Sequence, residues 1–261
     1  MKYLLDNRFA PVTFDWGFFE KPAEDIAEDL ADWMERLGRP GELVHFQDKR
    51  FPESLFLLEP LTNGGRNRDL LLETDSAWTA YFTNGSRVVD TGAVDYLAEA
   101  GNCRALKVSC RPDKVFNSKT GWEDIFGAVG FAYYPPGEID LTTFKGYRNV
   151  ICMRENKRFH FETHGEPLPF ENLEYYIAHK KRDRFTSEML EEYCAALGIR
   201  LFDPDFYGSK GVLVIDESPL PKDHEKVTIK DARAWWGFED EEKPGERETL
   251  MTKIMRMLKL K

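Results

Sequence analysis

The stretch RFHFETHGEP, residues 158–167, holds the residue types that are best able to do chemistry in this chain. His160, Glu162 and His164 occupy alternate positions, and imidazole and carboxylate groups are common ligands of transition metals. On a β-strand these three side chains point to one face, while Phe159 and Phe161 point to the other. The pattern therefore has two interpretations: a metal site, or the solvent-facing side of an antiparallel strand.

The spacing favours the plain strand. At roughly 3.3 Å per residue, the Cα atoms of His160 and His164 lie about 13 Å apart, whereas zinc needs its donor atoms about 2.0–2.2 Å away. Further ligands would have to come from elsewhere, and the other histidines are His45, His179 and His224. We therefore expect no cofactor and lean against an enzyme. The alternative is a metal-dependent hydrolase that uses His160, Glu162 and His164.

Other catalytic motifs are incomplete. The run VLVIDE, residues 212–217, resembles the strand that ends in a carboxylate in nucleotide-binding enzymes, but no G-x-x-x-x-G-K-[ST] loop accompanies it. No G-x-S-x-G turn is present. The four cysteines, Cys103, Cys110, Cys152 and Cys194, form no C-x-x-C pair, so neither a zinc ribbon nor a redox pair is predicted.

The charge balance indicates which partners to expect. Acidic residues outnumber basic ones by 46 to 36, which gives a net charge of −10. Such a charge repels nucleic acid and anionic lipid and attracts a basic protein. The basic run HKKRDR, residues 179–184, could hold phosphate, but the net charge opposes nucleic-acid binding. With no secretion signal and no long apolar run, we expect a cytoplasmic protein that binds neither nucleic acid nor membrane.

Aromatic residues beside glycine, proline and acidic residues suggest where a protein partner would bind. Interfaces often carry aromatic anchors inside a polar rim. Candidate anchors are Tyr133 and Tyr134, which precede Pro135-Pro136, and Trp235 and Trp236, which precede Gly237. The predicted rim consists of Glu239, Asp240, Glu241 and Glu242. The alternative, a core that wraps its own aromatic loops, stays open.

The hydrophobic pattern predicts an α+β fold, mainly an antiparallel sheet with hairpins packed by three to five helices. Helices are expected near residues 22–37, 91–101, 187–197 and 250–261. Strands are expected near 42–46, 54–61, 103–110, 199–203 and 210–217, and hairpin turns at Asn84-Gly85 and Asn156-Lys157. No long linker divides the sequence. We expect one domain over residues 1–261, or two halves that share a core with a boundary near 140–148.

Two stretches carry a family resemblance. The segments AWTAYFTNG with VDYLAEAGNCRAL, and KKRDRFTSEMLEEYCAALGIRLFDPDFY, are similar to parts of a loosely defined group of uncharacterised bacterial proteins. Members of that group look like immunity proteins of polymorphic toxin and interbacterial competition systems. The resemblance covers about residues 70–110 and 145–215 and includes no catalytic motif. It implies a cytoplasmic, acidic, single-domain bacterial protein that binds a toxin and blocks it. The net charge adds the expectation that the partner is a basic toxin domain.

Overall fold

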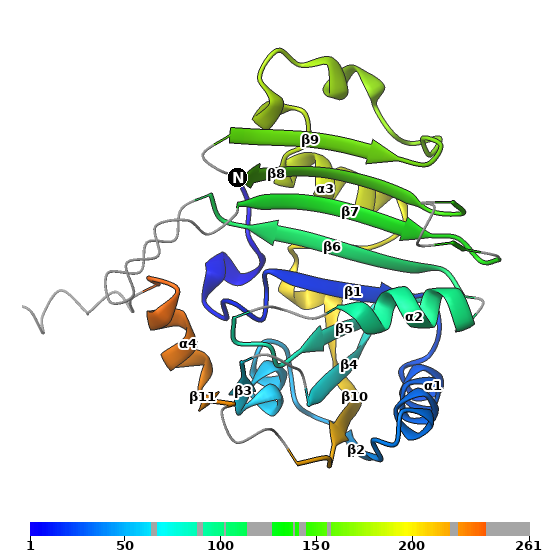
Figure 1. The fold of residues 1–261 in the computed structure, drawn as a ribbon, viewed down its shortest axis with the longest axis vertical. Helices are drawn as coiled ribbons and strands as arrows, with labels where there is room; N and C mark the ends of the chain where they lie inside the picture. The colour runs from blue at the N-terminus through cyan, green and yellow to red at the C-terminus, as the bar shows by residue number, and fades with distance from the viewer. Residues whose placement is uncertain are drawn as a thin grey trace, which may run out of the picture.

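The computed structural model describes residues 1–63, 67–87, 91–101, 103–113, 127–137, 139–140, 145–155, 158–219 and 224–238. Its strands are β1 (Asp15–Phe19), β2 (Gly41–Phe46), β3 (Leu61–Thr62), β4 (Arg68–Thr74), β5 (Thr79–Thr83), β6 (Ala105–Arg111), β7 (Ala128–Tyr134), β8 (Arg148–Glu155), β9 (Arg158–His164), β10 (Tyr207–Asp216) and β11 (Lys226–Val227). Nine of them form one sheet in the order β2-β10-β4-β5-β1-β6-β7-β8-β9 (Figure 1). All neighbouring strands in it are antiparallel, and β3 and β11 pair separately.

The described helices pack around this sheet. The α-helices are α1 (Ala23–Arg36), α2 (Gly92–Gly101), α3 (Ser187–Ala196) and α4 (Ile229–Trp235), and the 3-10 helices are η1 (Leu4–Asn7), η2 (Glu53–Leu58), η3 (Leu173–Ile177), η4 (Lys181–Asp183) and η5 (Pro204–Phe206). The predicted α+β class, with a mainly antiparallel sheet, is confirmed. No helix of the described part of the chain is long and apolar enough to cross a bilayer.

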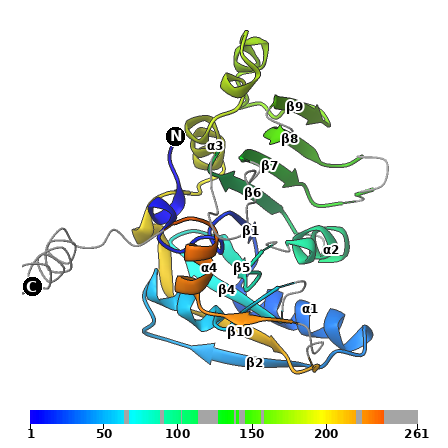
Figure 2. The same cartoon turned by 60° about the vertical axis from the view of Figure 1, so that its left-hand side comes forward.

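The two faces of the sheet are covered differently. On one face, which we call the core face, large buried side chains such as Trp16, Phe82 and Phe131 pack beneath the N-terminal segment and α3. On the opposite face, α1 lies against β10, β2 and β4, and α2 lies against β1 and β6. Figure 2 shows α1 and α2 on one side of the sheet and α3 and α4 on the other. We call the side with α1 and α2 the open face.

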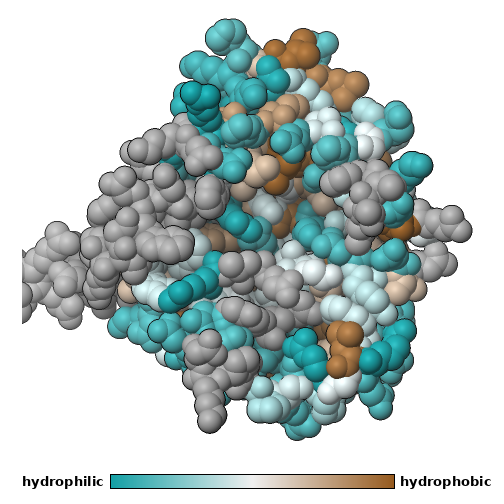
Figure 3. Space-filling model, in the orientation of Figure 1, coloured by the Kyte–Doolittle hydropathy of each residue, from teal (hydrophilic) through white to brown (hydrophobic). Residues whose placement is uncertain are grey.

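We call this face open because no helix of the described residues covers its part formed by β7, β8 and β9. Figure 1 shows α2 beside β6, with no helix of the described residues drawn over these three strands on this side. In space-filling form the same face is largely hydrophilic, and hydrophobic atoms show between hydrophilic side chains over the upper strands (Figure 3). Because strand side chains alternate between faces, one half of every strand here faces the core and the other half faces this surface.

Three helices and one hairpin lie where the hydrophobic pattern predicts them. α1, α2 and α3 match the predicted helices over 22–37, 91–101 and 187–197. The hairpin of β8 and β9 is present, with Glu155 opposite Arg158. The predicted boundary near 140–148 falls between β7 and β8, which are neighbours in the sheet. The domain division itself stays a prediction, and the helix expected over 250–261 lies outside the described residues.

Three local predictions are wrong. Residues 54–61 are not a strand but mostly the helix η2, because an apolar run this short fits either structure. Residues 199–203 form a turn. Asn84 makes no hairpin turn: its side-chain Oδ1 accepts the backbone N–H groups of Asn67 and Arg68 at 3.0 and 3.2 Å. The hairpin of β5 is made with β4, through residues 75–78.

Candidate functional site

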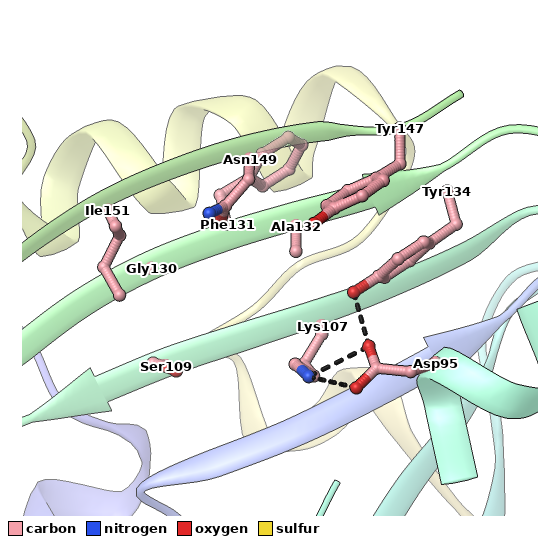
Figure 4. Close-up of a pocket in the computed structure, with 10 residues that line it drawn as sticks. All are labelled: Asp95, Lys107, Ser109, Gly130, Phe131, Ala132, Tyr134, Tyr147, Asn149 and Ile151. Atoms are coloured by element: carbon pink, nitrogen blue, oxygen red, sulfur yellow. Dashed lines mark hydrogen bonds and ion pairs between the residues drawn. The ribbon is translucent and has the colours of Figure 1, made fainter. Parts of the chain in front are cut away.

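A hollow of about 350 Å³ opens on the open face of the sheet, next to α2 (Figure 4). It combines a charged pair, two stacked tyrosines and a floor of small residues. Its lining residues are Asp95, Lys107, Ser109, Gly130, Phe131, Ala132, Tyr134, Tyr147, Asn149 and Ile151.

The sheet register explains why a hollow forms here. Ala132 of β7 lies between Lys107 of β6 and Asn149 of β8. In the next row on the same face, Gly130 lies between Ser109 and Ile151. In these two rows the middle strand thus carries almost no side chain on this face, while both flanking strands carry longer ones. The result is a trough along β7.

Asp95 organises the charged end of the hollow. It comes from the first turn of α2, and Lys107 Nζ lies 2.7 Å from its Oδ2 and 3.0 Å from its Oδ1. The Tyr134 hydroxyl donates to Asp95 Oδ1 at 2.5 Å. Burial, together with the Asp95 charge, raises the pKa of Tyr134 well above its usual range, so this hydroxyl stays protonated and acts as a donor. The carboxylate is thereby held by two donors from the sheet.

Two tyrosines form the aromatic end. The rings of Tyr134 and Tyr147 stack with centroids 5.1 Å apart and planes 19° apart. Tyr134 is buried, whereas Tyr147 is partly exposed. Burial and the Asp95 charge also raise the pKa of Tyr147. The hollow therefore has an aromatic wall that carries no charge at neutral pH.

A second feature lies beside the hollow, where α1 meets α2. The rings of Trp33 and Tyr96 stack with centroids 4.4 Å apart and planes 14° apart, and both side chains are partly exposed. α1 carries six carboxylates and one guanidinium. Asp29 and Asp32 lie within one turn of Trp33 on α1, and Glu99 lies one turn from Tyr96 on α2. We call this the acid-rimmed stack.

The predicted anchors Tyr133 and Tyr134 do not lie in a loop. Both belong to β7, and their exposed fractions are 9% and 2%. Pro135-Pro136 ends the strand just after them, so the aromatic residues precede the turn and do not form it. Tyr133 faces the core, whereas Tyr134 lines the hollow. Their burial removes the reason for naming them as exposed anchors.

The predicted anchors Trp235 and Trp236 lie at the end of α4 and are partly exposed. The Arg87 guanidinium lies 3.9 Å from the ring centroid of Trp235. Trp236 Nε1 donates to the Ser86 carbonyl at 2.7 Å, and its ring meets Phe14 edge to face at 5.4 Å. Both tryptophans thus hold α4 against the body of the protein. The predicted rim, Glu239, Asp240, Glu241 and Glu242, lies outside the described residues.

His160, Glu162 and His164 lie on one face of β9, as the alternation predicts. Phe159 and Phe161 pack against the core on the other face. The residues opposite the three polar ones on β8 are Met153, Ile151 and Asn149, respectively. None of these neighbours is a carboxylate, an imidazole or a thiolate. Nowhere in the described ranges do three such groups gather closely enough to hold a metal ion.

The first of the two carboxylates at the end of the run VLVIDE, Asp216, has a structural partner. Asp216 accepts from Arg39 Nε at 2.8 Å and from the Ser218 backbone N–H at 2.9 Å. Burial alone would raise its pKa, and the hydrogen bonds from Ser218 and Arg39 reverse this and lower it. These contacts join β10 to the chain before β2.

No family model, curated protein or solved structure matches this chain. The hollow and the acid-rimmed stack are the two features of the described residues that indicate a function. Neither the hollow nor the acid-rimmed stack could be predicted from residue spacing along the sequence. Their residues meet only through the sheet register and through the packing of α1 on α2.

Proposed function

We propose that this protein binds a basic protein partner and neutralises it, as a toxin-blocking immunity-like protein does. The observation that carries the proposal is the acid-rimmed stack, in which the partly exposed rings of Trp33 and Tyr96 lie 4.4 Å apart between two helices. Large aromatic residues are the commonest energetic anchors of protein interfaces. Here they sit on two rigid helices packed on the sheet, so little conformational entropy is lost on binding.

The charge around the stack supports a basic partner. α1 carries six carboxylates and one guanidinium. Its net charge of −5 is half of the chain's net charge of −10. Lys21 neutralises Asp29 at 2.6 Å, while Glu24, Asp25, Glu28, Asp32 and Glu35 are exposed. A localised acidic surface steers a basic partner toward it and raises the association rate.

The resemblance to immunity proteins adds the biological role to this proposal. Such a role needs a rigid surface that covers the partner and needs no catalytic group. The partner's chemistry follows from the surface: a basic patch with apolar atoms that can cover two aromatic rings.

The experiment is co-expression with the product of the adjacent gene, followed by a pull-down and binding kinetics at two salt concentrations. Trp33→Ala should weaken affinity by at least about 2 kcal/mol, mainly through faster dissociation. Asp25→Lys with Asp32→Lys should slow association and reduce its salt dependence.

The matched control is Glu166→Lys with Glu174→Lys, two exposed acidic residues near β9 and η3. It changes the net charge equally but leaves the carboxylates of α1 intact. If both double variants slow association to the same extent, net charge and not this surface attracts the partner. A complex unaffected by Trp33→Ala would contradict the proposal.

A further inference from the structure

We infer that the hollow over β7 is a binding site for a neutral, polyhydroxylated ring, that is, for a sugar unit. This inference is independent of the proposed function, because it depends on different residues and on a different class of ligand. It follows from the charge, the hydrogen-bonding groups, the aromatic wall and the size of the hollow.

Charge excludes most ionic ligands. Apart from the two tyrosines, the ionisable lining residues are Asp95 and Lys107, and they form a pair with Nζ–Oδ2 at 2.7 Å. Their charges cancel, so an anion meets the Asp95 carboxylate and a cation meets the Lys107 ammonium. An ionic group would lose its hydration without gaining an unpaired counter-charge. A neutral ligand avoids this cost.

The polar groups suit hydroxyls. The Lys107 ammonium has three N–H donors, and the two oxygens of Asp95 accept hydrogen bonds from it. One donor therefore remains for a ligand. The side-chain amide of Asn149, which both donates and accepts, makes no hydrogen bond to any described residue. Lys107 and Asn149 lie on opposite sides of Ala132 in one row of the sheet. A hydroxyl group can donate and accept at once, so a ring that carries several hydroxyls satisfies both sides of this trough.

The aromatic wall and the floor suit a saturated ring. Tyr147 is partly exposed and is backed by Tyr134 at 5.1 Å, so its position is fixed before a ligand arrives. Gly130 and Ala132 leave the floor flat, and Figure 4 shows Tyr147 and Asn149 on one side of it with Lys107 and Asp95 on the other. The C–H face of a sugar packs on one aromatic ring, while its hydroxyl edge meets the polar groups.

The size fits a small ligand. A volume of about 350 Å³ is at the lower end of the roughly 300–1,000 Å³ that is typical of ligand pockets. The hollow is open to solvent on one side, so it accommodates one ring, or the end of a short chain of rings. With few buried contacts, we expect weak affinity, with a Kd on the order of 1 mM for a single ring.

The experiment is ligand-observed NMR on the full chain with neutral mono- and disaccharides. The comparison ligands are a uronic acid, an amino sugar and a set of nucleosides. At least one neutral sugar should bind saturably, and its uronic acid and amino sugar counterparts should bind several-fold more weakly. Asn149→Ala and Tyr147→Ala should each weaken binding at least about tenfold.

The control is Tyr175→Ala, which removes a partly exposed tyrosine of η3 outside the hollow and should leave sugar binding unchanged. Thermal unfolding shows whether each variant is folded. If Tyr147→Ala does not fold, Asn149→Ala alone tests whether the sugar binds in the hollow. The inference is overturned if no neutral sugar binds, if nucleosides bind in their place, or if binding persists unchanged in Asn149→Ala.

Discussion

Two ion pairs, each joined to two tyrosines, lie on opposite faces of the same sheet. On the core face, Arg148 pairs with Glu171, which also accepts from the Tyr176 hydroxyl at 2.7 Å, and Tyr176 meets Tyr193 at 2.9 Å. On the open face, Lys107 pairs with Asp95, which accepts from Tyr134, stacked on Tyr147. The chemical groups are similar, but the surroundings are not.

Burial separates the two clusters. The side chains of Arg148 and Glu171 are 4% and 0% exposed, whereas those of Lys107 and Asp95 are 28% and 27% exposed. Arg148 makes four hydrogen bonds, because besides its two to Glu171 it donates to the carbonyl groups of His164 and Gly165 at 3.1 and 2.8 Å. A buried pair must be satisfied in this way, since each unmet group costs several kcal/mol. The open pair is partly exposed, and across Ala132 from Lys107 lies the side-chain amide of Asn149, which bonds to no described residue. The buried cluster is therefore expected to stabilise the fold, whereas the open cluster belongs to the proposed binding site.

The largest expected effect is the loss of the buried carboxylate. Glu171→Ala should lower the free energy of unfolding by about 3–5 kcal/mol, because it leaves the Arg148 charge buried without a partner. Chemical denaturation measures this. The double variant Arg148→Met, Glu171→Leu is the control and should recover a large part of the loss, since apolar residues of similar size remove the unpaired charge. A loss below about 1 kcal/mol in Glu171→Ala would mean that water reaches this cluster and that the contrast is false.

Acid should weaken the buried cluster selectively. Burial alone would raise the pKa of Glu171, but hydrogen bonds from Arg148, the Leu168 backbone and Tyr176 outweigh burial and lower it. A lowered pKa contributes stability above the unfolded value of about 4.3, and this stability is lost as the pH falls through the folded value. The stability difference between wild type and Glu171→Gln should therefore be greatest near neutral pH and shrink in acid. Denaturation curves at pH 7 and pH 3 test this, and a difference that grows in acid would contradict it.

Disruption of the open pair should cost much less. Asp95→Asn removes one charge but keeps an acceptor for the Tyr134 hydroxyl, and Lys107 retains contact with water. Partly exposed ion pairs contribute about 1 kcal/mol or less, so we expect a loss in that range by the same denaturation measurement. Lys107→Met, which removes the partner charge, should give a similar value. A loss in Asp95→Asn as large as that in Glu171→Ala would assign the open cluster a structural role.

Neither cluster was predicted from the sequence, although parts of the fold around them were. Alternation along residues 158–164 correctly placed Phe159 and Phe161 on the core face, and the hydrophobic pattern predicted α1 and α3. The hollow was not readable, because Asp95, Lys107 and Tyr134 come from three elements whose contact depends on strand order. Gly130 and Ala132 matter only because of what flanks them on β6 and β8. Tyr133 and Tyr134 show the same limit: adjacent residues in a strand face opposite environments, so they cannot serve as one pair of anchors.

The smallest expected effect concerns the two histidines of β9. His160→Ala with His164→Ala should change the free energy of unfolding by no more than about 0.5 kcal/mol, because both side chains lie on the open face without a metal-ligand neighbour on β8. Phe161→Ala is the control on the same strand. Its ring faces the core and meets Tyr176 at 5.1 Å, so its loss should be clearly larger. Elemental analysis of the purified protein completes the test. Stoichiometric zinc or iron that disappears in the double histidine variant would show that β9 does more than close the sheet, and would restore the metal-dependent hydrolase.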